Sequence, residues 1–465
     1  MSLRPNGIDG STGGYLAPAL DPAQLMERAA GRHGGAEDKD MHDLAERQKA
    51  VFGVGYGIDP LRIDSCGWGV LFAAGESPAV LAALQPLLDW RRAQGGCQVR
   101  VFAGQEGYRP GMRSETVLAE HGSAPGQPAD PAQVPYYLLI VGEPSAIPFA
   151  FQYELGLQYA VGRIAFDSAA QYASYARTVV QAEQGRLRRS RTAAFFGPGN
   201  PDDEATLLSS EHLVRPLAAL VKQRTREWEV GIYAGADAER QRLAGLVAAG
   251  PALLFAASHG VGFPSGHAQQ ARHQGALLCQ DWPGPLEHIG ELPPAFYFSA
   301  DDADGGAAPA GLVDMLFACF GAGTPAYDDF PEPGERRPQR LAPAPMVAPL
   351  VKALLGHPDG GALAVVGHVD RAWGWSFFWP GTRGAQLAGF RDALLPLMAG
   401  QPVGHAVNGF RLRHGELAAR LALSLAEIRN GKRIADAEQL AGMWTAYADA
   451  RNYLVMGDPA VRVAL

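Results

Sequence analysis

The chain has 465 residues, of which 47% are hydrophobic and 19% charged, and it exceeds the length at which a single core stops growing. We therefore expect two packed subdomains. The net charge of −8 disfavours nucleic acid and anionic membranes as partners. No apolar run approaches the roughly 20 residues of a membrane span, and the first residues lack a basic-then-apolar signal, so we expect a cytoplasmic protein.

The four cysteines lie at positions 66, 97, 279 and 319 and show no CxxC spacing. This pattern disfavours both a structural zinc site and a disulfide scaffold. A reducing compartment would keep Cys319 as a free thiol.

Residues 1–50 are rich in glycine, proline, aspartate and alanine, and we expect an extended, loosely packed lead-in with a short helix near 22–32. Residues 51–190 form the predicted N-terminal α/β subdomain. Apolar runs predict strands at 67–75, 99–104, 136–144 and 159–167. Amphipathic patterns predict helices at 43–52, at 78–94 with Ser77 as its cap, and at 168–189. The stretch 105–134 reads as a long surface connection.

Residues 191–465 form the predicted second, catalytic subdomain. Strands are expected at 193–199, 228–236, 252–260, 295–302, 312–320 and 360–370. Helices are expected at 202–225, capped by Asp202 or Asp203, and at 237–248, 347–355, 383–399, 402–429 and 436–450. The alternation of strands and helices predicts an α/β fold with a mostly parallel sheet.

Two of the buried strands end in residues that can do chemistry. The run ALLFAASHG ends in His259 and Gly260, and the run LVDMLFACFGAG reaches Cys319 and then Gly321. Parallel strands that end at one edge deliver their last side chains into one crevice, where a histidine and a cysteine can act as base and nucleophile. A lone buried cysteine or histidine is more often structural. The prediction therefore depends on finding both residues at the ends of such strands.

These motifs resemble a known family. SHG after an apolar strand, and ACFGAG after a later one, are similar to the catalytic pattern of clan CD cysteine peptidases, the caspase, gingipain and CHAT-domain group. YYLLIVGEPSAIPF followed by YAVGRI resembles the first subdomain of gingipain-like members, and YLVMGDPAVRVAL resembles their terminal motif. The resemblance covers about residue 65 to the end.

The resemblance implies a caspase-hemoglobinase-like three-layer α/β/α fold, in which the first subdomain is not catalytic. It implies a cysteine endopeptidase that needs no cofactor, acts on protein or peptide substrates in regulated proteolysis, including defence or cell death, and answers to a regulatory partner or activating protease. Cys319 would be the nucleophile and His259 the general base and acid. The backbone N–H groups of Gly260 and Cys319 would form the oxyanion hole. Glu143 could orient His259, although a surface carboxylate in a turn is the plainer interpretation.

We expect carboxylates and one aromatic side chain to set the specificity. An acidic pocket would hold a basic P1 residue, the residue on the N-terminal side of the cleaved bond. The candidates are Asp301, Asp302, Asp328, Asp329 and Trp373. Aspartates at strand ends are also ordinary turn formers, and tryptophans of this kind are also ordinary core. Arg371, next to Asp370 in the sequence, keeps a preference for Asp at P1 as an alternative. Phe317 stands where metacaspases usually carry an acid.

The proline-rich loop 324–345 carries Arg336, Arg337 and Arg340, and we expect it to be a processing or gating site. A zinc hydrolase is disfavoured because His267 and His273 lack a nearby acidic partner. The Gly-rich turn after residue 196 lacks the nucleotide-binding patterns. The remaining rival is a catalytically idle relative that keeps the fold as a binding or scaffold module.

Overall fold

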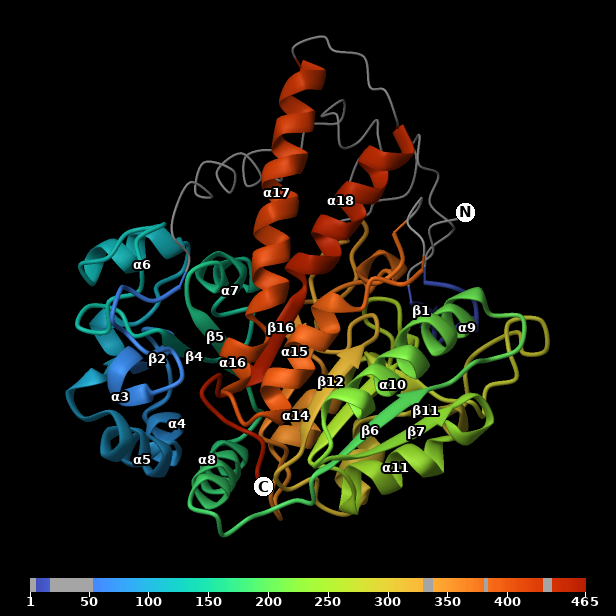
Figure 1. Cartoon of the computed structure of the whole chain (residues 1–465), viewed down its shortest axis with the longest axis horizontal. Coiled ribbons are helices and arrows are strands. Elements are labelled where there is room, and N and C mark those ends of the chain that lie inside the picture. Colours follow the sequence, from blue (N-terminus) through green and yellow to red (C-terminus); the bar gives the residue numbers. More distant parts are fainter. Residues whose placement is uncertain (1–5, 17–52, 329–337, 380–383, 430–436) are drawn as a thin grey trace.

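The computed structural model describes residues 6–16, 53–328, 338–379, 384–429 and 437–465 (Figure 1). The helices predicted at 22–32 and 43–52 lie outside these residues. Within them, a ten-stranded sheet runs through the centre of the molecule, in the order β3-β2-β4-β5-β16-β15-β12-β8-β6-β7. Its strands are β2 (Trp68–Phe72), β3 (Val99–Phe102), β4 (Tyr137–Val141), β5 (Ala160–Ile164), β6 (Thr192–Gly197), β7 (Glu229–Ala234), β8 (Leu253–Ala257), β12 (Val313–Phe317), β15 (Ala364–His368) and β16 (Tyr453–Gly457).

The sheet consists of two parallel halves that run in opposite directions. The strands β3, β2, β4, β5 and β16 are parallel to one another, and so are β15, β12, β8, β6 and β7. The halves meet at β15 and β16, which pair antiparallel over five residues. The predicted α/β fold with a mostly parallel central sheet is therefore confirmed.

Helices pack against this sheet along its whole width. In the view of Figure 1, α10 and α15 lie in front of the strands, while α17 and α18 pack on each other and project beyond the sheet. The helices are α3 (Ile63–Cys66), α4 (Pro78–Ala83), α5 (Gln85–Gly95), α6 (Ser114–Glu120), α7 (Phe149–Gly156), α8 (Ala169–Glu183), α9 (Glu204–Ser209), α10 (Arg215–Arg224), α11 (Arg240–Ala249), α12 (Gln270–His273), α13 (Ala300–Gly305), α14 (Pro349–Leu355), α15 (Ala388–Met398), α16 (Val403–Ala406), α17 (Asn408–Arg429) and α18 (Ala437–Arg451).

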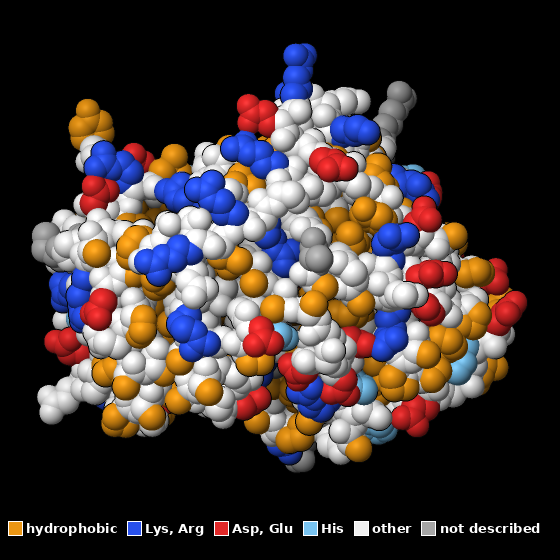
Figure 2. Space-filling view, turned by 90° about the horizontal axis from the view of Figure 1, so that it is seen from below, with side chains coloured by type: hydrophobic (Ala, Val, Ile, Leu, Met, Phe, Trp, Pro, Cys, Tyr) orange, Lys and Arg blue, Asp and Glu red, His pale blue; other side chains and the backbone are white. Residues whose placement is uncertain are grey.

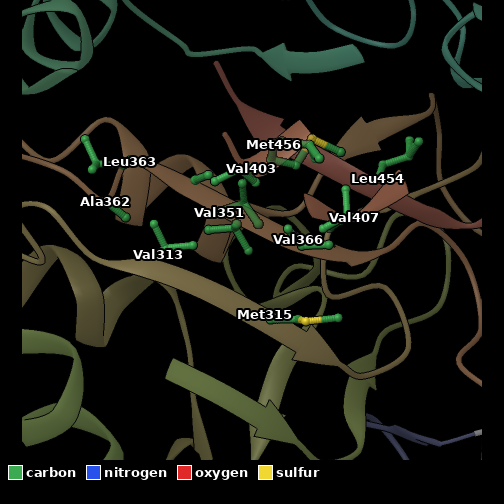
Figure 3. Packing of buried hydrophobic residues seen from close by; sticks show 14 of the residues in the cluster. Val313, Met315, Val351, Ala362, Leu363, Val366, Val403, Val407, Leu454 and Met456 are labelled. Atoms are coloured by element: carbon green, nitrogen blue, oxygen red, sulfur yellow. The ribbon is translucent and has the colours of Figure 1, made fainter. Parts of the chain in front are cut away.

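The strands form where the sequence is continuously apolar, because a parallel strand is covered on both faces. Figure 3 shows Val313 and Met315 of β12 close to Val366 of β15 and Val351 of α14, all of them buried. This packing holds β12, the strand before Cys319, between β15 and β8 in the second half of the sheet.

Several predicted elements differ from the structure in detail. The predicted helix 78–94 is interrupted at Leu84, where α5 begins with a proline in its first turn. The predicted helix 202–225 contains a π-helical turn, Ser210–Val214, between α9 and α10. The connection 105–134 contains α6. The predicted strand 295–302 is wrong outside β11 (Tyr297–Phe298), because a 3-10 turn, Pro294–Phe296, precedes this strand and α13 begins at Ala300.

A second, four-stranded sheet in the described residues was not predicted. Its order is β1-β9-β10-β11, with β1 (Gly7–Asp9), β9 (Gly260–Gly262) and β10 (Ala276–Leu278). A short pair, β13 (Gly323–Thr324) with β14 (Met346–Val347), follows the cysteine strand. Residues 6–16 are not loosely packed, because Ile8 is fully buried in an apolar cluster with Val261 and Trp282.

On the molecular surface, acidic and basic side chains are interspersed with hydrophobic ones over the face seen in Figure 2. None of the helices in the described part of the chain is long and apolar enough to cross a membrane.

Candidate active site

His259 and Cys319 occupy equivalent positions after two adjacent parallel strands. The register pairs Ala257 of β8 with Phe317 of β12, so each candidate lies two residues beyond the last pair. Ser258 continues the ladder, because its N–H donates to the carbonyl of Phe317 over 3.1 Å. The two residues therefore leave the sheet at the same edge, as the sequence predicted.

The backbones at these two positions touch. A Cβ added to Gly260 would lie 1.6 Å from the carbonyl oxygen of Cys319, so only glycine fits there. The residue after the cysteine, Phe320, has a φ of 58°, and its N–H donates to the carbonyl of Asp370. The glycine and the turn bring the two strand ends into direct contact.

His259 is held by a buried carboxylate. Its Nε2 lies 2.8 Å from Oδ2 of Asp203, and both side chains are fully buried. Asp203 caps α9 and accepts hydrogen bonds from Thr206, through both N–H and hydroxyl, and from the hydroxyl of Tyr15. Burial alone would raise the pKa of Asp203, but His259 and these donors hold the pKa well below its ordinary value.

The second ring nitrogen of His259, Nδ1, is not held by the carboxylate of Asp203. A carboxylate at Nε2 favours a proton on that nitrogen, which leaves Nδ1 as the acceptor in the neutral ring. Nδ1 is buried and has no hydrogen-bond partner among the described residues. The imidazole is therefore fixed in orientation with one nitrogen available.

Sequence reasoning named Asp203 only as a helix cap. It considered Glu143 as the residue that orients His259, but the carboxylate of Glu143 lies 2.5 Å from Nζ of Lys352 instead. Asp203 reaches the histidine because β6, which precedes it, pairs with β8 in the sheet. Strand order of this kind is a long-range property, and the local sequence carries no signal for it.

The thiol of Cys319 is fully buried. Burial raises its pKa to about 12, although the N–H of Ala372, which lies 3.3 Å from Sγ, and the charge of Arg371 act in the opposite direction. In this arrangement the sulfur is a thiol at neutral pH.

Two backbone donors at the strand ends converge on one oxygen atom. The N–H groups of Gly260 and Cys319 both donate to the carbonyl oxygen of Asn6, over 3.0 and 3.2 Å. These are the two groups that the resemblance nominated for an oxyanion hole. The structure brings them together around a peptide carbonyl of this chain.

A cavity of about 470 Å³ lies next to these groups. Its apolar lining residues include Leu207, Leu208, Phe317 and Phe377, and its polar ones include Glu204, Glu211 and His212. Asn6 lines it too.

The aspartates predicted after β11 are engaged elsewhere. Asp301 accepts from Arg272 and His273, and Asp302 caps α13 through Ser299 and pairs with Arg240. Neither residue lines the cavity beside Asn6. Their position on a helix rather than at a strand end explains the difference.

Asp328 and Trp373 are also not brought to this cavity. Asp328 is buried and forms two hydrogen bonds with the guanidinium of Arg371, while Asp329 lies outside the described residues. Trp373 is fully buried in an apolar cluster with side chains of α17 and α18. Of the predicted loop 324–345, residues 329–337 lie outside the description.

No protein-family model matches the sequence, and no curated protein matches it significantly. Among solved structures, the chain is similar to one described as "Structure of Protease", with a TM-score of 0.52 and 12% identity over 86% of this chain and 79% of the other. The predicted fold, and the resemblance to proteases at the level of the fold, are thereby confirmed.

Two structures of gingipain R from Porphyromonas gingivalis give lower scores. The Arg-specific proteinase itself gives a TM-score of 0.47 at 14% identity, with coverage of 87% of this chain and 80% of that one. A complex of its pro- and mature domains gives 0.45 at 12% identity, with coverage of 85% and 80%.

Proposed function

We propose that the protein is a cysteine endopeptidase in which Cys319 attacks the substrate carbonyl and His259 transfers the proton to the leaving amine. The observation that carries this proposal is the convergence of the N–H groups of Gly260 and Cys319 on one carbonyl oxygen. Two preorganised donors aimed at one oxygen are the arrangement that stabilises the oxyanion of acyl transfer.

The chain's own groups account for each step of the reaction. Nδ1 of His259 accepts the proton of the Cys319 thiol as Sγ adds to the substrate carbonyl carbon, and the carbonyl oxygen takes up negative charge between the two N–H donors. The tetrahedral intermediate then collapses to a thioester as the C–N bond breaks and His259 gives this proton to the leaving amine. Water then hydrolyses the thioester with His259 as base, and Asp203 keeps the ring oriented throughout.

We further propose that the enzyme cuts after arginine or lysine, because the cavity next to Asn6 would receive the P1 side chain. Its apolar wall suits the methylene stem, and Glu204 or Glu211 suits the cationic end. Glu211 also accepts from Arg215 on the solvent side. These two glutamates take the role that the sequence assigned to aspartates.

A positional-scanning peptide library tests both parts of the proposal. We expect cleavage after Arg or Lys that is lost in Cys319→Ala and kept in Cys279→Ala, a matched buried cysteine away from the cavity. Glu211→Gln should lower kcat/KM for Arg peptides about 10-fold, and Glu227→Gln, an exposed partner of Arg191, should not.

The outcome that overturns the proposal is also defined. If neither the wild type nor a variant with residues 6–16 displaced, as described below, cleaves any peptide above the Cys319→Ala background, the protein is an idle scaffold with a peptidase fold. Cleavage after a neutral or acidic residue would retain the peptidase and reject the basic pocket. Regulated proteolysis with a protein partner stays part of the proposal for an active enzyme.

A further inference from the structure

Residues 6–16 lie across the candidate active site. In Figure 1, β1 is beside α9 on the catalytic half, far from β2 at the other end of the sheet. β1 runs parallel to β9, with Gly7 opposite Gly260, Ile8 opposite Val261 and Asp9 opposite Gly262. The segment therefore enters the site as an extended strand directly beyond His259.

The backbone of Asn6 makes the contacts of a residue whose peptide bond is presented for cleavage. Its carbonyl oxygen accepts from both strand-end N–H groups, and its own N–H donates to the carbonyl of Ala372 over 2.9 Å. Its side-chain amide donates to the carbonyl of Ser258 over 2.7 Å. All three contacts use groups beside the candidate catalytic pair.

The residues after Asn6 cover the thiol and the imidazole. A Cβ on Gly7 would lie 2.9 Å from Sγ of Cys319, so the sulfur sits against the start of β1. The ring of Tyr15 contacts His259 edge-on at 5.9 Å, and its hydroxyl donates to Asp203. Buried Ile8 anchors the segment, which explains why Cys319 and His259 have no solvent exposure.

We propose that residues 6–16 are an intramolecular pseudo-substrate: Asn6 occupies the P1 position, β1 occupies the primed side, and the segment keeps Cys319 covered until it is displaced. This inference rests on the proposed function, because the positions P1 and P1′ are defined by that reaction. It also predicts that substrates bind on the primed side as a strand parallel to β9.

Asn6 is a poor match for the pocket that it borders. This mismatch explains why the segment would block the active site without being cleaved. Its short amide is bonded to Ser258, while the lining of the cavity of about 470 Å³ beside it includes Glu204 and Glu211, which a longer cationic side chain would reach.

Gly7→Val tests the covering role. A Cβ at Gly7 would lie 2.3 Å from Cδ1 of Leu16 and 2.8 Å from Cβ of Cys319, so the segment must move away. Gly14→Val is the matched control, because the nearest atom to a Cβ there is the hydroxyl of Thr12 at 3.6 Å. Two rates are measured: alkylation of Cys319 by iodoacetamide, read by peptide mass spectrometry, and hydrolysis of Arg peptides.

We expect both rates to rise at least about 10-fold in Gly7→Val and to stay at the wild-type level in Gly14→Val. Unchanged alkylation in Gly7→Val, in protein that melts cooperatively, would overturn the inference. Faster alkylation without any hydrolysis would support the covering segment and reject the peptidase. The two proposals can thus fail separately.

Asn6→Arg tests the register without disturbing the packing of β1. Arginine at this position should fill the cavity and convert the segment into a substrate, so that the chain loses residues 1–6 and begins at Gly7. Asn6→Arg combined with Cys319→Ala should keep its intact mass. If Gly7→Val hydrolyses Arg peptides while Asn6→Arg stays uncut, Asn6 does not occupy P1 and the register is wrong.

Discussion

Two buried His–Asp pairs flank β12, one on each side, and they differ in what surrounds them. His259, after β8, pairs with Asp203 at 2.8 Å, and His368, the last residue of β15, pairs with Asp449 at 3.1 Å. All four side chains are fully buried. Distance and burial therefore do not separate a candidate catalytic histidine from a structural one.

The neighbours separate the two pairs. His368 is enclosed by the rings of Tyr453, at 4.0 Å, and Phe317, at 5.5 Å, and its Asp449 also accepts from Ser376 and the N–H of Trp373. This network joins β15, β16 and α18.

His259 instead precedes Gly260, whose N–H is one of two convergent donors, and its ring contacts Tyr15 of the segment 6–16 and Trp282 edge-on. The contrast suggests what a His–Asp pair needs for catalysis: a place beside it where a substrate carbonyl group can bind. Substituting matching residues of the two pairs tests this contrast, and the tests below run from the largest expected effect to the smallest.

The largest difference is expected between His259→Ala and His368→Ala. Loss of the proton-transfer group should lower kcat about 100- to 10,000-fold, whereas loss of His368 should leave kcat per folded molecule within about 10-fold. Peptide hydrolysis, measured on protein quantified by its cooperative unfolding transition, reports this difference. An equal loss of kcat in both variants would show that His259 is no more catalytic than His368.

A smaller effect is expected from Asp203→Asn against Asp449→Asn. Without the carboxylate, the imidazole of His259 loses its fixed tautomer and orientation, and kcat should fall about 10- to 100-fold with little change in KM. Asp449→Asn should chiefly lower the free energy of unfolding, because that carboxylate serves Ser376 and Trp373. Parallel kinetic and thermal measurements on the two variants separate these results.

The pH dependence of stability sharpens the same comparison. The folded pKa of Asp203 lies below its ordinary value of 3.8, so its stabilising contribution is present above about pH 4 and is lost as the pH falls through the folded pKa. The gap in unfolding free energy between wild type and Asp203→Asn should therefore narrow from pH 5 toward pH 2. A constant gap would indicate that the pKa of Asp203 is the same in the folded and the unfolded chain.

The smallest effect on activity is expected at Asp314, a buried carboxylate of β12 without a histidine. Burial raises its pKa to about 8, and its Oδ1 has no hydrogen-bond partner among the described residues. Between pH 4 and 8 the unfolded chain ionises this group and the folded chain does not, so stability falls as the pH rises.

The difference in unfolding free energy between Asp314→Asn and wild type should therefore be about 2 to 5 kcal/mol more favourable to the variant at pH 8 than at pH 4. The kcat of the variant should be unchanged. Chemical denaturation at the two pH values measures it. A variant equally stable relative to wild type at both would show that Asp314 ionises normally.

The sequence predicted much of the fold because its strands are apolar runs of the length that a covered parallel sheet requires, as in β4 and β8. It also placed His259 and Cys319 at one sheet edge, since both follow such runs. Asp203 was found only as a cap, because its contact with the histidine depends on the pairing of β6 with β8. The role of Asn6 depends on a strand pairing 253 residues apart, and glycine-rich sequence around it gave no apolar signal.

The position of β16 has a consequence for how the protein is made. This strand lies at residues 453–457, yet it joins β5 to β15 in the middle of the sheet. A ribosome delivers it after every other described strand, so until then β5 and β15 each present an unsatisfied edge, the kind of surface that attracts other chains. Truncation just before residue 453 should thus leave two half-sheets prone to aggregate, and a chaperone that shields those edges would act late in synthesis.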